Sequence, residues 1–178
     1  MNNRTVAIAA WAFAATIFAG AYAAQTAGYA VNVTESMPRG LWRITPMTRE
    51  PRAGDVVAFC PTDTAPFRLA KERDYIPGGH CPDGYTPVIK PIAATAGDRI
   101  NVTSLGVIIN GTPIPNTAPA TRDSAGRPLF PQIGSVTVPA GSLWFLATRV
   151  PNSYDSRYFG AVPATAIIGH AQPVLTER

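Results

Sequence analysis

The chain has little charge and few of the residue types that hold metals. Charged side chains make up 15% of its 178 residues, against about 25% in typical domains. It has two histidines and two cysteines, and Cys60, His80 and Cys81 lack both a fourth ligand and a paired zinc-site spacing. No glycine-rich phosphate loop is present. We therefore expect no metal and no cofactor.

The basic residues do not form the clusters that bind polyanions. The formal net charge is +4, but only two of the 15 basic side chains are lysines, Lys71 and Lys90, and the arginines are scattered singly. Nucleic-acid-binding proteins gather such residues on one face or helix, so we expect no nucleic-acid partner. A hydrophobic content of 46% without a visible repeat also excludes disordered and collagen-like chains.

The N-terminal segment has no charged side chain between Arg4 and Glu35. Within it, Thr5–Ala24 is apolar throughout, and a helix of this length spans about 30 Å, the thickness of a bilayer core. We predict a membrane anchor in residues 1–30. The alternatives are a signal peptide cleaved after Ala21-Tyr22-Ala23 and a buried helix of a soluble protein. The apolar run exceeds the usual signal-peptide core of about 7–15 residues, which favours the anchor.

The side of the membrane on which the rest of the chain lies is not fixed by charge. Basic residues occur soon after the span as well as before it, namely Arg39, Arg43, Arg49 and Arg52. Cys60 and Cys81 are an even pair 21 positions apart, which in an oxidising compartment would close a loop by a disulfide. The alternative is two free thiols.

Residues 31–178 show short apolar runs separated by Pro, Gly, Asn and Asp, which predicts one mainly β domain, partly closed or sandwiched. The Asn110-Gly111 pair between apolar residues predicts a tight hairpin. Loops or insertions are expected over 61–87 and 115–135. The predicted strands are Asp55–Cys60, Val88–Ala94, Arg99–Thr103, Gly106–Ile109, Thr112–Ile114, Val136–Val138, Leu143–Thr148 and Ala166–Val174.

The two lysines have different surroundings. Lys71 lies among charged residues, as a solvated lysine does. Lys90 lies in an apolar strand-like run and shares a face with Val88 and Ile92. Burial lowers the pKa of a lysine, and a neutral amine is a general base. The alternative is that Lys90 extends from a sheet edge to water.

A base of this kind needs a nucleophile, and Ser36 is the candidate hydroxyl. It precedes Met37-Pro38-Arg39-Gly40, where Pro38 and Gly40 favour a turn that presents a hydroxyl and a backbone N–H together. Thr34 lies two residues earlier, on the same face of an extended segment. A plain loop serine is the alternative. Neither His80 nor His170 has flanking residues that suggest a triad base.

Four motifs, taken in order, carry a resemblance to a known family. They resemble the successive motifs of the type I signal peptidases, membrane-anchored serine proteases that use a Ser/Lys dyad, and the spacing around Pro38 and the single span are similar to the conjugative-transfer (TraF) subgroup. The motifs are Ser36-Met37-Pro38, Gly54-Asp55-Val56-Val57-Ala58-Phe59, Lys90 with Ala96-Gly97-Asp98, and Asn152-Ser153-Tyr154-Asp155-Ser156-Arg157-Tyr158-Phe159-Gly160.

The resemblance implies a signal-peptidase-like β-sheet domain and a role for each matched residue. Ser36 would be the nucleophile and Lys90 the general base, Thr34 with the Ser36 N–H the oxyanion donors, and Ser153 the hydroxyl that orients the amine. Asp155 and Arg157 would form a structural ion pair, expected on one strand face unless both are merely solvated.

The resemblance also implies partners and a location. The substrate would be a pilin precursor, trimmed at its C-terminus and possibly cyclised through an acyl-enzyme, or another exported polypeptide. The enzyme would lie in the bacterial inner membrane, in contact with the lipid bilayer, with its catalytic domain in the periplasm. The alternatives are a general leader peptidase that cleaves after Ala-x-Ala and a non-catalytic, membrane-anchored assembly factor.

Overall fold

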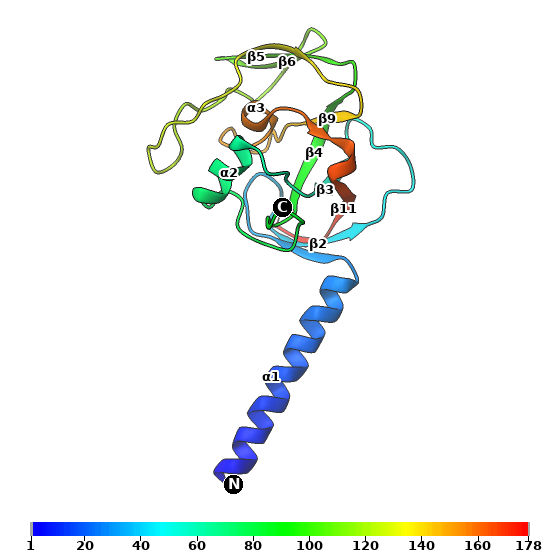
Figure 1. Ribbon diagram of the computed structural model, residues 1–178, viewed down its shortest axis with the longest axis vertical. Coiled ribbons are helices and arrows are strands. Elements are labelled where there is room, and N and C mark those ends of the chain that lie inside the picture. The colour runs from blue at the N-terminus through cyan, green and yellow to red at the C-terminus, as the bar shows by residue number, and fades with distance from the viewer. Residues whose placement is uncertain (1, 178) are drawn as a thin grey trace.

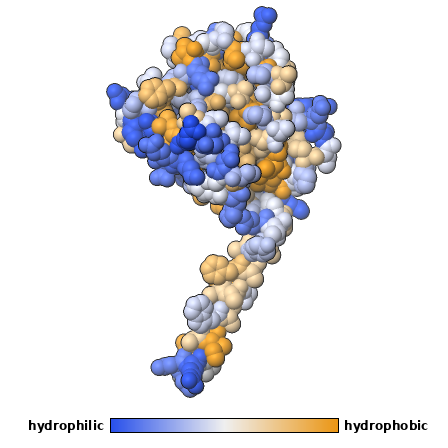
Figure 2. All heavy atoms as spheres, in the orientation of Figure 1, coloured by the Kyte–Doolittle hydropathy of each residue, from blue (hydrophilic) through white to orange (hydrophobic). Residues whose placement is uncertain are grey.

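A computed structural model describes residues 2–177; Met1 and Arg178, the outer ends of the two predicted segments, lie outside it. Helix α1 (Asn3–Thr26) projects away from a compact head, as Figure 1 shows. Within it, Val6–Thr26 has a mean hydropathy of 1.8 and none of it is buried. Figure 2 shows this helix as pale to orange along most of its length. It is long and apolar enough to cross a membrane, and it is not the buried helix of a soluble core.

The head is built from two sheets, and every strand pairing within residues 2–177 is antiparallel. The prediction of a mainly β fold is confirmed. The larger sheet has seven strands in the order β1 (Tyr29–Asn32), β2 (Gly40–Thr45), β11 (Ile167–Thr176), β3 (Val56–Phe59), β4 (Val88–Thr95), β9 (Ser142–Phe145) and β10 (Val162–Pro163). The smaller has four, in the order β7 (Thr112–Ile114), β6 (Gly106–Ile109), β5 (Arg99–Thr103) and β8 (Gly134–Thr137).

The smaller sheet matches its predicted strands closely. Strands β5, β6 and β7 have the predicted bounds, and β6 and β7 join through Asn110 and Gly111, both at positive φ. The hairpin prediction is therefore confirmed. In the larger sheet, β1 and β2 were not predicted at all. They form a local hairpin, and β11 pairs with the other edge of β2 although it is more than a hundred residues distant along the chain.

Two short helices occur outside the sheets, besides a 3₁₀ turn at Ala164–Ala166. Helix α2 (Ala65–Glu72) falls in the segment predicted as a loop, and it is stabilised by burying Phe67 and Ala70. Its eight residues are too few for a clear helical period in the sequence. Helix α3 (Ser156–Phe159) lies in the last of the four motifs. A disulfide joins Cys60 to Cys81 and closes the segment that contains α2.

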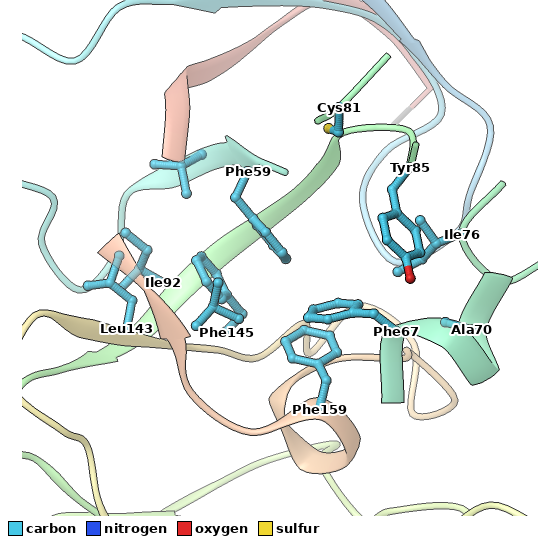
Figure 3. Close-up of a cluster of buried hydrophobic side chains, with 12 residues drawn as sticks. Phe59, Phe67, Ala70, Ile76, Cys81, Tyr85, Ile92, Leu143, Phe145 and Phe159 are labelled. Carbon is cyan, nitrogen blue, oxygen red and sulfur yellow. The ribbon is translucent and has the colours of Figure 1, made fainter. Parts of the chain in front are cut away.

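An aromatic core holds the larger sheet against both short helices (Figure 3). Phe59 of β3 stacks on Phe145 of β9 at 4.5 Å between ring centroids, and Phe67 of α2 stacks on Phe159 of α3 at 4.7 Å. Phe59 also contacts Phe67 edge to face. These contacts fix α2 and α3 relative to the sheet that carries the candidate site. A second core lies beneath the smaller sheet, formed by Ala94, Ile100, Val102, Val107, Val138, Trp144 and Leu146.

Candidate active site

Ser36 lies in the loop that joins β1 to β2. The last paired residues of this hairpin are Asn32 and Gly40, so residues 33–39 form a closed loop, here called the serine loop. Gly40 has φ +131°, and a Cβ there would lie 2.2 Å from the Leu175 carbonyl oxygen, so only glycine fits. Ser36 is 8% exposed, while Thr34 and Glu35 beside it are exposed. The loop therefore turns this one hydroxyl inward.

Lys90 lies in the middle of β4, where it pairs with Val57. Only 4% of it is exposed, so it does not extend to water and that alternative is wrong. Its Nζ donates a 2.6 Å hydrogen bond to Ser153 Oγ. Burial lowers the pKa of Lys90 from 10.5 to about 8; Asp155 raises that pKa and Arg157 lowers it further. A useful fraction of this amine is neutral near pH 8.

Ser36 and Lys90 line the same cavity, whose volume is about 360 Å³ and whose walls are mainly apolar. Strands β1 and β4, the serine loop and residues 150–154 all contribute to its wall, including Thr34 and Ser153. The structure thus brings together the predicted nucleophile and base, the predicted oxyanion donor Thr34 and the predicted orienting hydroxyl of Ser153. Lys90 donates its hydrogen bond to Ser153 rather than to Ser36.

Thr34 has a second partner that the sequence did not suggest. Its Oγ1 lies 3.2 Å from Ser36 Oγ, and it donates its proton to Asn32 Oδ1 at 2.8 Å. The Thr34 proton is therefore directed to Asn32, which also lines the cavity. Asn32 was not among the predicted site residues. Its only sequence signal is an asparagine between two valines, a residue type that strands disfavour.

Asp155 and Arg157 form a fully buried, two-point ion pair. Nε donates to Oδ1 and Nη2 donates to Oδ2, each at 2.8 Å, and both residues are 0% exposed. The prediction that the two residues lie on one strand face is wrong, because Asp155 caps the N-terminus of α3 and Arg157 lies within that helix. The alternative, that both side chains are solvated at the surface, is also wrong, because both are buried. Arg157 further donates to the carbonyls of Pro151 and Ser153, so the pair fixes the loop that carries Ser153.

Part of the cavity wall comes from the predicted insertion at 115–135, through Arg122, Asp123 and Leu129. Asp123 accepts hydrogen bonds from the Tyr75 hydroxyl and from Arg127 Nε. Burial alone would raise the pKa of Asp123, but these hydrogen bonds hold it well below its usual range. The insertion is thus tied to the segment that follows α2.

Other singled-out residues lie outside the cavity wall. Lys71 is exposed and donates to the Gly84 carbonyl. Trp42, which follows the serine loop, is 2% exposed and belongs to the core. His80 and His170 do not line the cavity. Within residues 2–177 no group of three or more potential metal ligands is found.

These observations define a class of protein: an antiparallel β domain behind one apolar helix, with a buried lysine and an inward-turned serine in one cavity. A family model described as "Signal peptidase, peptidase S26" matches residues 3–176. The chain belongs to this family.

Several individual proteins are similar to this chain. A conjugal transfer protein TraF of Agrobacterium fabrum (strain C58 / ATCC 33970) is 42% identical over 84% of this chain and 83% of its own. A plasmid transfer protein TraF of Escherichia coli is 39% identical over 92% and 90%. A signal peptidase I of Leptolyngbya laminosa is 32% identical over 68% of this chain and 51% of its own.

Proposed function

We propose that this protein is a membrane-anchored serine endopeptidase in which Ser36 is the nucleophile and Lys90 the general base. The observation that carries the proposal is Lys90: a lysine buried inside a strand, with its pKa lowered to about 8, in the cavity that Ser36 also lines. Burying an ammonium is costly. A catalytic role for the neutral amine as a base explains why this cost is tolerated. Ser-Lys pairs are known variants of the serine triad.

The proposed reaction is acyl transfer. Neutral Lys90 takes the Ser36 proton as Oγ attacks the scissile carbonyl. The Ser36 N–H and the Thr34 hydroxyl then donate to the oxyanion, where one such donor is worth about 3–4 kcal/mol. The intermediate collapses as Lys90 returns the proton to the leaving amine, which leaves an ester on Ser36. Attack by water releases a linear product, and attack by an amine of the same chain forms a peptide bond and a ring.

The substrate we propose is a pilin precursor of a conjugative system, trimmed at its C-terminus and cyclised through the acyl-enzyme. Support comes from the similar TraF proteins, which are named as conjugal or plasmid transfer proteins. The second candidate, a general leader peptidase, is supported by the similar signal peptidase I. Under a third, a non-catalytic assembly factor, the buried amine would have no role.

We further propose that α1 anchors the enzyme in the inner membrane, with the head in the periplasm. Residues 1–30 would be the anchor and 31–178 the catalytic domain. The length and hydropathy of α1 support the anchor. The Cys60–Cys81 disulfide supports an oxidising compartment.

Mass spectrometry of a co-expressed pilin precursor tests the function. The wild-type protein should yield a trimmed product, and loss of one further water reveals cyclisation. Ser36→Ala should leave the precursor intact, with Lys71→Ala as a matched control that processes normally. Processing by Ser36→Ala would overturn the mechanism. Cleavage only after Ala-x-Ala in many exported proteins would favour the leader peptidase.

A further inference from the structure

Asn32 makes five hydrogen bonds to the serine loop, more than any other side chain among residues 2–177. Its Nδ2 lies 3.0 Å from the carbonyl oxygens of Thr34, Met37 and Pro38, so its two N–H groups serve three acceptors and one of them is shared. Its Oδ1 accepts from the Thr34 backbone N–H at 3.2 Å and from the Thr34 hydroxyl at 2.8 Å. A single carboxamide thus contacts the loop both before and after Ser36.

The orientation of this carboxamide is fixed by its partners. A backbone N–H can only donate, so the atom facing Thr34 N must be the amide oxygen. The three carbonyl oxygens can only accept, so the amide nitrogen must face them. Neither aspartate nor a hydrophobic residue offers both faces at once. These five contacts therefore require a side-chain amide.

We propose that Asn32 is a positioning residue of the peptidase, which holds the serine loop so that Ser36 Oγ faces into the cavity and Thr34 Oγ1 lies beside it. This inference rests on the proposed function. Asn32 is the last paired residue of β1, so its backbone is anchored to the sheet while its side chain reaches into the loop. It does not touch the reacting atoms; it acts through Thr34 and Ser36.

A second hydrogen bond to the serine loop shows which part of the loop depends on Asn32 alone. The Pro38 carbonyl accepts from both Asn32 Nδ2 and Trp42 Nε1, the latter at 2.9 Å from the core side. Trp42 thus holds the end of the loop, while Asn32 alone also reaches Thr34 at its beginning. Removing Asn32 should therefore free the Thr34 side of the loop while the Pro38 side stays attached.

The same contacts mean that Asn32 sets the direction in which the Thr34 hydroxyl proton points. Because Thr34 Oγ1 donates to Asn32 Oδ1, its lone pairs face Ser36, and Ser36 is the donor of the pair in the free enzyme. When the oxyanion forms, the Thr34 hydroxyl must turn from Asn32 to the substrate. Asn32 thus keeps the hydroxyl close to its working position before substrate arrives, which reduces the ordering needed in the transition state.

The test is steady-state kinetics of the full chain in detergent, with a purified pilin precursor as probe. Asn32→Ala should lower kcat by about 10- to 100-fold, the loss that a misplaced reacting group causes, and should change KM much less than kcat, since positioning acts on the reacting groups rather than on substrate affinity. Asn32→Asp keeps the volume and the acceptor oxygen but turns a carboxylate towards three carbonyls. It should be at least as slow.

The matched control is Asn101→Ala on β5, which lies outside the cavity wall and should keep wild-type kinetics. Combining Asn32→Ala with Thr34→Ala should cost less than the product of the two single losses, because the residues act together. A purely structural role would give independent losses. Unchanged kcat in Asn32→Ala, or a loss confined to KM, would overturn the inference.

The outcomes separate this inference from the proposed function. If Ser36→Ala still processes the precursor, the proposed function fails. If Ser36→Ala is inactive while both Asn32 variants match the wild type, only the role of Asn32 fails. Thermal unfolding of each variant is recorded alongside, and if neither Asn32 variant folds, Asn32 is a folding residue and the positioning role is overturned.

Discussion

The two sheets divide the molecule into a part that the sequence describes well and a part that carries the site. The smaller sheet is formed by neighbouring segments, and its three predicted hairpin strands have the observed bounds. None of its strands lines the cavity. The larger sheet pairs segments far apart in the chain, and its strands and loops hold Ser36, Lys90 and Ser153. Local signals thus predict the sheet that supports the fold, while the site depends on long-range pairing.

The largest expected effect that follows from this contrast comes from Lys90→Met in the larger sheet. Processing should fall by roughly 10⁴-fold or more, as when a member of a catalytic serine unit is removed. The same variant should be more stable at pH 7, by about 2 kcal/mol. The lowered pKa of Lys90 corresponds to a burial cost of about 3 kcal/mol, and the Ser153 hydroxyl loses a partner worth about 1 kcal/mol. Precursor processing and chemical denaturation measure the two effects.

Lys71→Met is the matched control for that variant, since Lys71 is exposed. It should leave processing unchanged. An active Lys90→Met enzyme would contradict the dyad. A stability loss in an inactive Lys90→Met protein would instead show that the burial cost is smaller than the pKa implies.

Asp155→Asn should have the next largest effect, on stability. It leaves the Arg157 guanidinium buried beside a neutral amide, and removing one partner of a buried pair costs about 3–5 kcal/mol. Chemical denaturation checks this value. The double change Asp155→Asn with Arg157→Met should recover part of the loss. A single variant as stable as the wild type would mean that the ion pair does not hold the Ser153 loop.

The pH profile gives a third test. Below the pKa of Lys90, kcat/KM should change by about tenfold per pH unit. In the mechanism we propose, the active form of Lys90 is the neutral amine, and its population rises with pH up to the lowered pKa of about 8. kcat/KM should therefore increase towards pH 8 and level off above it. Initial rates between about pH 6 and pH 10 measure this. A rate that falls from pH 7 to pH 8 would be incompatible with Lys90 as the base.

The smallest expected effect belongs to the smaller sheet. Gly111→Ala places a Cβ at φ +83° in the Asn110-Gly111 turn, which should cost about 1 kcal/mol of stability. Processing should be unchanged, because neither residue lines the cavity. Denaturation and precursor processing on the same sample check both statements. A marked loss of processing without unfolding would break the division between the two sheets.

The same contrast explains which features of the site could be predicted. Lys90 was identified because a lysine in an alternating apolar run is anomalous on its own, and the ordered motifs supplied Ser36 and Ser153. Asn32 was missed because its contacts depend on the hairpin of β1 and β2, two strands that the sequence did not predict. Asp155 and Arg157 were expected on a strand, since two-residue spacing suits a strand face and a four-residue helix leaves almost no periodic signal.

The joint between α1 and the head sets a geometric limit on what the enzyme can cut. Only Ala27 and Gly28 separate α1 from β1, and the Gly28 carbonyl accepts a 2.7 Å hydrogen bond from the Ile44 N–H of β2. A Cβ at Gly28 would lie 2.2 Å from the Ile44 carbonyl oxygen, so the joint is close-packed. With α1 in the bilayer as we propose, Ser36 works at a nearly fixed height above the lipid. The enzyme would then select cleavage sites by their distance from the membrane as well as by their sequence.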